Sequence, residues 1–437
     1  MTIKKHILII TYYWPPSGGP AVQRWLSYSA YLKKAGFEVS ILTVDENYAS
    51  FPSIDLSLNT QIEEGINVYK TKTKEVFNLY KKTIGRGQVP SSAFANESNP
   101  GPLKKIARFI RGNFFIPDAR KAWNKYALPK AKQIIYDHKV DVVITAGPPH
   151  STHLMGLKIK KAFPHIYWIA DFHDAWTDII FYKELFHTKI AALIDASLEK
   201  KVLDKSDHVL TVGENWIQKF CSKSVNLKPS KFHILRMAFD ENKFLDSTPK
   251  HREPKNHLTF AYTGTISDNY HPEVFIDALV AIKLEHPAFD FTLQFAGILA
   301  ENIRTYIIKA GLEKNLQELG YLPHSQSIQL LKSADVLLLV NPKIEQEDMV
   351  IPGKIYEYLA AKRVIINITN KTCETANLIK FCDSGDTFER NETDRLKNYI
   401  YKIWLNQSEH TFIKENIYSF SKDKQSSSFI SFLREIN

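Results

Sequence analysis

The stretch "VLLLVNPKIEQEDMVIPGKIYEYLAAKRVIINIT", residues 336–369, decides the fold class of this 437-residue chain. Val336–Val340 and Val364–Ile368 are short apolar runs bounded by polar residues, a pattern typical of strands covered on both faces. Between them Pro352 and Gly353 open a helix, because the fixed φ of proline suits the first helical turn. This order of strand, helix and strand predicts an α/β fold with parallel pairing.

The first turn of this predicted helix carries Lys354, with Glu357 one turn further on. A cation is unfavourable beside the positive end of a helix dipole unless an anion is bound there. Free N–H groups at a helix N-terminus also favour phosphate. The stretch therefore indicates an anion site, or else an ordinary strand–helix–strand unit with a solvated lysine–glutamate pair. The residues of this stretch alone favour neither interpretation.

Length and composition limit the number of domains and the kinds of partner. The length predicts two large domains, and 44% hydrophobic residues with 24% charged residues is ordinary for a globular protein. The net charge of +10 favours polyanions, nucleotides or an anionic membrane surface as partners. Cys221, Cys373 and Cys382 are far apart, which argues against a disulfide framework or a zinc site and fits a reducing cytoplasm. No apolar run approaches the roughly 18 residues that span a bilayer.

The N-terminal part of the sequence reads as a strand over His6–Thr11, a helix over about 21–34 and a strand over Val39–Val44. The loop before the helix contains Gly18 and Gly19. Adjacent glycines either let the backbone approach a ligand closely or only shape the turn. The spacing is not G-x-G-x-x-G, so no dinucleotide fingerprint is present.

Strands continue to alternate with helical patterns along the chain, which predicts two doubly wound parallel sheets facing a central cleft. Residues 246–257 lose hydrophobic periodicity and form the predicted linker. We therefore expect domains at 1–245 and 258–410 and a helical tail at 411–437 that packs back on the N-terminal domain. A mobile loop is expected at about 82–102. The further predicted strands are 66–69, 140–145, 166–170, 208–212, 258–263, 289–295 and 319–322.

The segment 101–132 is strongly basic. Asp118 is its only acid, and aromatic and aliphatic residues interleave with the charges. Such a segment either lies on an anionic membrane or holds a phosphorylated acceptor, or is an amphipathic helix with a solvated basic face. Both interpretations stay open. The nine cations are Lys104, Lys105, Arg108, Arg111, Arg120, Lys121, Lys125, Lys130 and Lys132.

A cluster of titratable residues follows the predicted strand 166–170. Asp171, His173 and Asp174 lie at its carboxyl end, where open α/β sheets bind ligands. A histidine beside carboxylates can act as a general acid or base or contact a phosphate. It can equally well only satisfy backbone groups of the loop.

Taken together, these segments resemble the retaining glycosyltransferases of family 4, which have the GT-B fold. The resemblance covers nearly the whole chain, with eight segments in the family's order. They are "YYWPPSGGPAVQRWLSYSAYLKKAGFEVSILTV" (12–44), "FIPDARKAW" (115–123), "GPPHSTH" (147–153), "DFHDAW" (171–176), "AYTGTIS" (261–267), "FAG" (295–297), "LGYLPHSQSIQLLKSADVLLL" (319–339) and "IPGKIYEYLAAKRVI" (351–365).

The resemblance implies two Rossmann-like domains, with the donor site mostly on the second. It implies transfer of a sugar from a nucleotide-diphosphate sugar to an acceptor hydroxyl with retention, and without a metal or a cofactor. Helix N-termini and cations would neutralise the departing diphosphate. It further implies a role in building a surface polysaccharide or glycolipid, in the cytoplasm or on the inner face of the cell membrane, with a glycan or lipid-linked acceptor.

Individual residues take expected roles from the same resemblance. Glu357 is expected on the donor ribose, Lys354 on the diphosphate and Leu322 in the base pocket. His173 and Asp174 are the expected catalytic residues. The expected donor-binding residues are Gly18, Gly19, Gly264, Thr265, Leu322, Lys354 and Glu357. The expected acceptor or membrane residues are Arg108, Arg111, Asp118, Trp123 and His150.

The sequence departs from the family pattern at three places. The first glutamate of the family's E-x7-E motif falls at Met349, so contacts to the donor sugar ring are open. Thr265 and Ser267 stand where many members carry arginine and lysine, and Met237-Ala238 replaces an Asn-Gly pair. These changes either leave more of the diphosphate binding to Lys354 and the helix dipole, or else reduce the activity.

Two other functions remain as alternatives. The fold also hosts nucleotide-sugar epimerases and hydrolases. A non-catalytic basic protein that binds nucleic acid or membrane is the second alternative. No RNA-recognition or helix-turn-helix pattern is present, so nucleic acid is not an expected partner.

Overall fold

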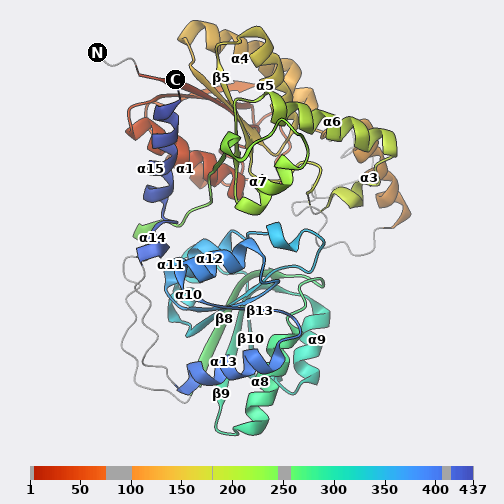
Figure 1. Ribbon diagram of the computed structural model, residues 1–437, viewed down its shortest axis with the longest axis vertical. Coiled ribbons are helices and arrows are strands. Elements are labelled where there is room, and N and C mark those ends of the chain that lie inside the picture. The colour runs from red at the N-terminus through yellow and green to blue at the C-terminus, as the bar shows by residue number, and fades with distance from the viewer. Residues whose placement is uncertain (1–3, 75–100, 180, 245–256, 406–414, 437) are drawn as a thin grey trace. The chain divides into compact units, whose positions relative to one another are not determined.

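The computed structural model describes residues 4–74, 101–179, 181–244, 257–405 and 415–436 (Figure 1). The chain forms two compact units, residues 1–236 with 426–437, and residues 237–425. The division therefore falls at Arg236, before the predicted boundary at residue 245. The predicted linker 246–257, except for its last residue, lies outside the described residues. The predicted loop 82–102 also lies outside them up to residue 100.

The first unit is built on a seven-stranded parallel sheet in the order β3-β2-β1-β4-β5-β6-β7. Successive side chains of a strand point to opposite faces, and each face of this sheet has its own core. Ile7 and Ile9 of β1 belong to one core, and Leu8 and Ile10 belong to the other. The strands are β1 His6–Ile10, β2 Glu38–Val44, β3 Asn67–Thr71, β4 Val142–Gly147, β5 Tyr167–Phe172, β6 His208–Thr211 and β7 Phe232–Ile234.

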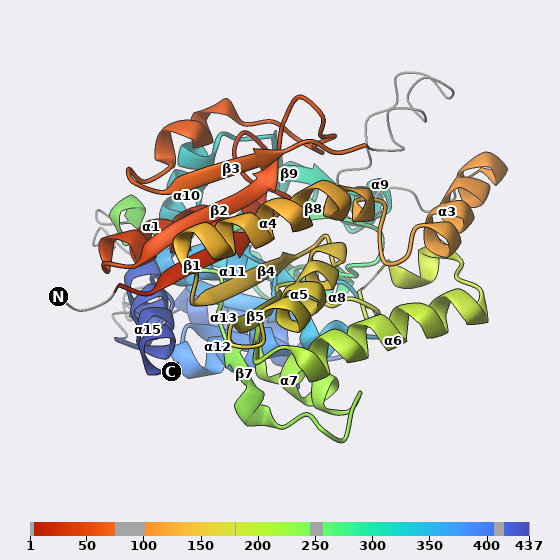
Figure 2. The same ribbon diagram turned by 90° about the horizontal axis from the view of Figure 1, so that it is seen from above.

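Helices cover both faces of this sheet (Figure 2). The core that contains Leu8 and Ile10 also holds residues of α4, α5 and α7, and the opposite core holds residues of α1 and α15. The sheet is therefore doubly wound, as predicted. The helices are α1 Pro20–Lys34, α3 Pro102–Phe114, α4 Asn124–His138, α5 Ser151–Ala162, α6 Lys189–Lys205, α7 Glu214–Cys221 and α15 Lys422–Glu435.

The second unit repeats this architecture on a six-stranded parallel sheet, ordered β10-β9-β8-β11-β12-β13. Leu337 and Leu339 of β11 join the core beneath α10, α11, α12 and α14, and Leu338 joins the core beneath α8, α9 and α13. The strands are β8 His257–Ile266, β9 Asp290–Leu299, β10 Leu316–Gly320, β11 Val336–Val340, β12 Val364–Ile368 and β13 Gly385–Phe388. The helices are α8 Glu273–Glu285, α9 Glu301–Lys309, α10 His324–Ser333, α11 Lys354–Ala361, α12 Glu374–Cys382, α13 Thr393–Leu405 and α14 Glu415–Tyr418.

Both sheets reverse their strand order at one point, and this places the candidate site. In the first sheet the reversal lies between β1 and β4, and in the second it lies between β8 and β11. Ligands of open α/β sheets bind outside the carboxyl ends of the strands at such a point. The loops that matter are therefore those that follow β1, β4, β8 and β11.

The last helix, α15, closes one face of the first unit. Phe429 is fully buried, and its ring centre lies 6.3 Å from that of Trp25 and 5.8 Å from that of Tyr28, both on α1. Lys5 Nζ donates a hydrogen bond to the carbonyl of Leu433 at 3.1 Å. In the part of the chain that the structure describes, no helix is both long and apolar enough to cross a membrane.

Replacing Phe429 tests the packing of α15. We expect Phe429→Ala to lower the free energy of unfolding of the first unit by about 3–5 kcal/mol, because a large buried ring leaves a cavity. Urea unfolding followed by tryptophan fluorescence measures the loss. The exposed neighbour in Ser428→Ala should change it by less than about 0.5 kcal/mol. Equal effects of the two substitutions would contradict the packing role of α15.

Candidate functional site

Lys354 forms the centre of the candidate site in the second unit. It begins α11 directly after the loop that follows β11. Its Nζ donates a hydrogen bond to the hydroxyl of Tyr262 at 2.6 Å and lies 3.8 Å from the centre of that ring. Tyr262 belongs to β8. The lysine therefore reaches across the point where the strand order reverses.

Within the described ranges, the charge of Lys354 has no counter-ion. Burial lowers the pKa of Lys354 to about 7. Among the described residues, no carboxylate forms an ion pair with its ammonium group, whose contacts are the hydroxyl and ring of Tyr262. No side chain caps the start of α11 either. A desolvated ammonium beside an uncapped helix N-terminus favours the binding of an anion.

Gly264 has no side chain, and this leaves room for the ammonium group of Lys354. Its φ is +103°, and a Cβ at this position would lie 3.0 Å from Lys354 Nζ. The next residue, Thr265, uses its carbonyl to accept a hydrogen bond from the Tyr262 hydroxyl at 2.8 Å. The structure therefore brings the predicted residues Gly264, Thr265 and Lys354 together around Tyr262, which was not among the predicted site residues.

Glu357 lies one turn along α11 and is held from outside the helix. His324 Nε2 contacts Glu357 Oε1 at 2.6 Å. The glutamate side chain is 31% exposed, so its carboxylate stays open to a ligand. Leu322, two residues before His324, is partly buried against the core beneath α11. His324 lies in a quoted motif, but its contact with Glu357 was not predicted.

Glu347 lies close to Met349, where the sequence departs from the family's E-x7-E motif. Its carboxylate is already paired within the second unit. The side chain of Glu347 is buried and accepts hydrogen bonds from Arg390 Nη1 at 2.9 and 3.1 Å. The hydroxyl of Thr369 donates to it at 2.7 Å. Arg390 also donates to the carbonyl of Asn341 at 2.7 Å, at the start of the loop. This pair braces the loop between β11 and α11, so Glu347 is not available as a ligand group.

In the first unit, His173 follows β5 and lies beside Asp174. Their Nδ1 and Oδ1 atoms are 3.5 Å apart. Burial lowers the pKa of His173, and the nearby Arg24 lowers it further, while Asp174 and Asp171 act in the opposite direction. The imidazole is therefore neutral at pH 7. It can donate one hydrogen bond and accept another, but it carries no positive charge.

A buried ion pair fixes the surroundings of His173. Arg24 Nη2 lies 3.0 Å from Asp171 Oδ1, and both side chains are almost fully buried. Trp25 Nε1 donates to the same carboxylate at 2.9 Å, and Arg24 Nη1 donates to the carbonyl of Leu235 at 2.7 Å. Arg24 and Trp25 belong to α1, so this pair ties the start of α1 to the end of β5. The role of Arg24 was not predicted from the sequence.

The two glycines before α1 have different surroundings. A Cβ on Gly18 would lie 2.8 Å from the hydroxyl of Ser53, and its N–H donates to the Ser53 carbonyl at 3.0 Å. Gly19 has a φ of +109° and precedes α1 without a side-chain cap. No described atom lies within 4 Å of a Cβ built on it. Gly18 therefore shapes the loop, and Gly19 leaves open space at the start of α1.

Several of the predicted acceptor residues have structural contacts. Asp118 accepts hydrogen bonds from the N–H and the hydroxyl of Ser151, the first residue of α5, at 2.7 and 2.9 Å. Trp123 is fully buried and donates to the Thr71 hydroxyl at 2.8 Å. These two residues hold elements of the first unit together, and their expected acceptor or membrane role stays a prediction.

Histidine and arginine residues of this group are also buried. His150 Nε2 contacts the carbonyl of Ala175 at 3.1 Å, and its ring stacks on Trp176 with centres 5.2 Å apart. The buried guanidinium of Arg108 pairs with Glu184 at 2.6 Å. Burial lowers the pKa of Arg111, and the nearby Asp118 opposes that change. Arg108 and His150 therefore point into the protein.

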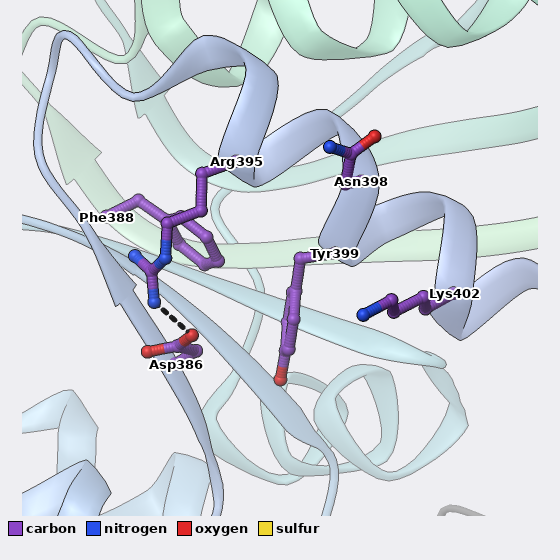
Figure 3. A pocket seen from close by; sticks show the side chains of 6 residues that line it. All are labelled: Asp386, Phe388, Arg395, Asn398, Tyr399 and Lys402. Carbon is purple, nitrogen blue, oxygen red and sulfur yellow. Dashed lines mark hydrogen bonds and ion pairs between the residues drawn. The ribbon is translucent and has the colours of Figure 1, made fainter.

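Two of the cavities in the described part of the chain lie on the second unit, and neither of these two is lined by Lys354 or Glu357. One of about 620 Å³ lies at the carboxyl ends of β9 and β10 and is lined by Gly297, Ile298, Leu299, Arg304, Glu318 and Gly320. The other, of about 470 Å³, lies between β13 and α13 (Figure 3). Its Arg395 pairs with Asp386 and stacks on Phe388, so its charges are largely satisfied within the unit.

No metal centre emerges from residues 4–74, 101–179, 181–244, 257–405 and 415–436. Within these ranges no three His, Cys, Asp or Glu side chains are grouped so that they could hold a metal ion. The expectation of metal-independent chemistry stays a prediction.

The lowered pKa of Lys354 predicts a pH-dependent stability. Its pKa in the folded protein is about 7, below the usual lysine value of 10.5, so the unfolded chain binds more protons between these values. The free energy of unfolding should therefore rise from pH 7 to pH 10 by more in the wild type than in Lys354→Met. Urea unfolding at a series of pH values measures the difference. Lys343→Met, at an exposed lysine of the preceding loop, should follow the wild type. A curve for Lys354→Met that parallels the wild type would contradict the lowered pKa.

Comparison with known proteins supports the fold. No protein-family model and no curated protein matches the sequence. Solved structures do match along the whole chain. Sucrose-phosphate synthase from Thermosynechococcus elongatus is 13% identical with a TM-score of 0.59, and the match covers 99% of each chain. HepE from Anabaena, solved with UDP, is 12% identical with a TM-score of 0.60, and the match covers 99% of this chain and 100% of the other.

A glycosyltransferase from Rickettsia africae is 15% identical with a TM-score of 0.59, and the match covers 99% of each chain. Similarity at this level of identity shows the fold alone. These neighbours are GT-B glycosyltransferases, and they share the two parallel-sheet α/β units described above. The chain therefore has the GT-B fold, as its sequence predicted.

Proposed function

We propose that this protein is a glycosyltransferase that moves a sugar from a nucleotide-diphosphate sugar to an acceptor hydroxyl with retention. The observation that carries the proposal is the buried ammonium of Lys354, which has no carboxylate partner in the described part of the chain and lies at the uncapped start of α11. It lies at the point where the strand order of the second sheet reverses. The structures similar to this chain include one solved with UDP. The proposal assigns the donor to the second unit and the acceptor to the first.

Lys354 would bind the diphosphate. Transfer breaks the bond between the anomeric carbon and the β-phosphate oxygen and forms a bond from that carbon to the acceptor oxygen, while the acceptor's hydroxyl proton passes to the departing phosphate oxygen. The leaving diphosphate gains negative charge, and a fixed cation with a helix N-terminus stabilises this charge without a metal or a cofactor. Because Thr265 and Ser267 supply no positive charge, Lys354 would carry a large share of this work.

Glu357 would bind the donor ribose. Its partly exposed carboxylate can accept hydrogen bonds from vicinal hydroxyls, and the contact with His324 holds it in place. Leu322 on the same side would contact the base. In the first unit, the neutral imidazole of His173 would donate a hydrogen bond to a sugar hydroxyl or a phosphate oxygen. Asp174 would orient that imidazole, and the open space over Gly19 would admit the diphosphate or the acceptor.

The acceptor in this proposal is a glycan or a lipid-linked sugar, and the product is part of a surface polysaccharide or glycolipid. We place the enzyme in the cytoplasm, where nucleotide sugars are made and thiols stay reduced. Nucleic acid is not part of the proposal.

Nucleotide binding should be linked to the protonation of Lys354. A bound diphosphate raises the pKa of Lys354 from about 7, so binding at pH 8 takes up a proton and affinity falls between pH 7.5 and 9. We expect calorimetric titrations with UDP, GDP, ADP and dTDP, each in two buffers of different ionisation enthalpy, to show this for the nucleotide that binds. Lys354→Arg, which stays charged, should bind without proton uptake, and Lys354→Met should bind at least about tenfold more weakly. Failure of all four nucleotides to bind would contradict the proposal.

The role of His173 is tested by turnover. With a donor and an acceptor preparation, the wild type should release nucleoside diphosphate only when the acceptor is present, whereas an epimerase would convert the donor alone. His173→Ala should lower kcat by about 10²-fold and change donor affinity by less than about threefold, because the imidazole acts at the reacting sugar. His165→Ala, at an exposed histidine of the same unit, is the control. If His173→Ala instead weakens donor binding and leaves kcat unchanged, His173 is a donor-binding residue.

A further inference from the structure

Helix α3 packs against the rest of the first unit with its polar side inward. The residues of this helix that are buried are Arg108 and Gly112. Gly112 is pressed against Leu185, since an added Cβ would lie 2.4 Å from the Leu185 carbonyl. The opposite side of the helix carries Leu103, Ile106, Ile110 and Phe114, at helical spacings of three and four. Leu103 is 82% exposed and Phe114 is 75% exposed.

Helix α6 has the same reversed polarity at its start. Ile190 is 72% exposed and Leu193 is 70% exposed, and the neighbouring Ile194 is also exposed. The inward side of this helix carries carboxylates instead. Asp195 accepts hydrogen bonds from Trp176 Nε1 at 2.7 Å and from the Tyr182 hydroxyl at 3.0 Å, and burial raises its pKa to about 6.

The two helices that carry these apolar stripes contact each other. Asn113 of α3 accepts a hydrogen bond from the N–H of Thr188, which caps α6, at 2.7 Å. Its amide also donates to the carbonyl of Phe186 at 3.1 Å. The figures show α3 beside α6 in both views (Figures 1 and 2). We call this surface, formed by Leu103, Ile106, Phe109, Ile110, Phe114, Phe186, Ile190, Leu193 and Ile194, the α3–α6 face.

The charges around the α3–α6 face are almost all positive. Residues 101–117 and 181–194 contain one acid, Glu184, which pairs with the buried Arg108. Lys105 and Lys189 are exposed at the start of the two helices. The cations of these ranges are Lys104, Lys105, Arg108, Arg111, Lys183 and Lys189.

We propose that the α3–α6 face inserts into the headgroup region of an anionic lipid leaflet. Projecting aliphatic and aromatic side chains flanked by lysines are what an interfacial helix needs, because the apolar groups enter the acyl boundary and the lysines meet anionic headgroups. A second copy of this chain would bring the same lysines together, so charge complementarity favours lipid over self-association. This surface goes beyond the proposed transferase function, and no residue of the proposed donor or acceptor site belongs to it.

Only part of the basic segment 101–132 belongs to this proposed membrane surface. Helix α4 packs Ala127, Ala131 and Ile134 into the core, so its lysines form an ordinary solvated face. Arg108 is itself buried and pairs with Glu184, so it would not contact lipid. The proposed membrane surface consists of α3 and the start of α6. No membrane role was predicted for α6 from the sequence.

Co-sedimentation of the full chain with vesicles tests this proposal. Wild type should bind vesicles of phosphatidylcholine with 30% phosphatidylglycerol at least about tenfold more tightly than pure phosphatidylcholine vesicles. The variant Leu103→Ser/Leu193→Ser should lose at least about tenfold in affinity for the anionic vesicles, because two exposed apolar side chains no longer insert. Lys105→Gln/Lys189→Gln should weaken binding to the anionic vesicles and leave binding to the neutral vesicles unchanged. Leu284→Ser, at an exposed leucine of α8 in the second unit, is the matched control and should bind like the wild type.

All these substitutions are at exposed positions, so melting temperatures and nucleotide binding should stay at wild-type values and separate this test from that of the proposed function. Absence of vesicle binding, equal binding to both lipid compositions, or equal loss in Leu284→Ser would overturn the proposal. Concentration-dependent dimerisation in sedimentation velocity that Leu103→Ser/Leu193→Ser abolishes would overturn it as well, in favour of a second copy as the occupant.

Discussion

The contact between Lys354 and Tyr262 is the interaction on which the account of the donor site depends. An ammonium 3.8 Å from the centre of an aromatic ring gains from the ring quadrupole and from one hydrogen bond to the hydroxyl. These neutral partners only partly offset the loss of water, and burial lowers the pKa accordingly. Gly264, which has a positive φ and no side chain, and the uncapped start of α11 both leave the Lys354 ammonium accessible to an anion. An anionic ligand would therefore complete the electrostatics of the second unit.

The first unit shows the opposite arrangement, and the contrast explains which charges we assign to structure. Arg24 and Asp171 are equally buried, but they neutralise each other and accept or donate further hydrogen bonds within the unit. Removing one partner of such a pair leaves a buried charge, so the pair holds α1 to β5 and offers nothing to a ligand. Glu347 and Arg390 behave in the same way in the second unit. Lys354 differs from both pairs, because the contacts of its ammonium group among the described residues are the neutral hydroxyl and ring of Tyr262.

Much of the fold could be predicted from sequence because the strands are short apolar runs at regular intervals. β11 and β12 lie where their patterns predicted, and α1 begins one residue earlier than expected. The edge strands β7 and β13 were missed, since three or four residues carry too little periodicity. The resemblance assigned donor-binding roles to Lys354, Gly264 and Glu357, which lie on α11 and β8, and these roles stay predictions. It could not reveal the contacts of Tyr262 or His324, because these depend on strands and helices that are distant in the sequence. Trp123 and His150, which the resemblance placed among the acceptor or membrane residues, are part of the packed interior, a property that the sequence pattern did not indicate. Hydrophobic periodicity also gave no sign of the reversed polarity of α3 and α6, because it shows that a helix has an apolar side but not which side packs inward.

Nuclear magnetic resonance of the Lys354 side chain, with ¹³C-labelled lysine assigned through Lys354→Arg, tests the central claim most directly. The account predicts a pKa of about 7 for Lys354 in the free protein and a rise of at least about two pH units when a nucleoside diphosphate saturates the site. A pKa near the ordinary lysine value in the free protein, or one that the bound nucleotide leaves unchanged, would contradict the assignment of Lys354 as the cation of the donor site.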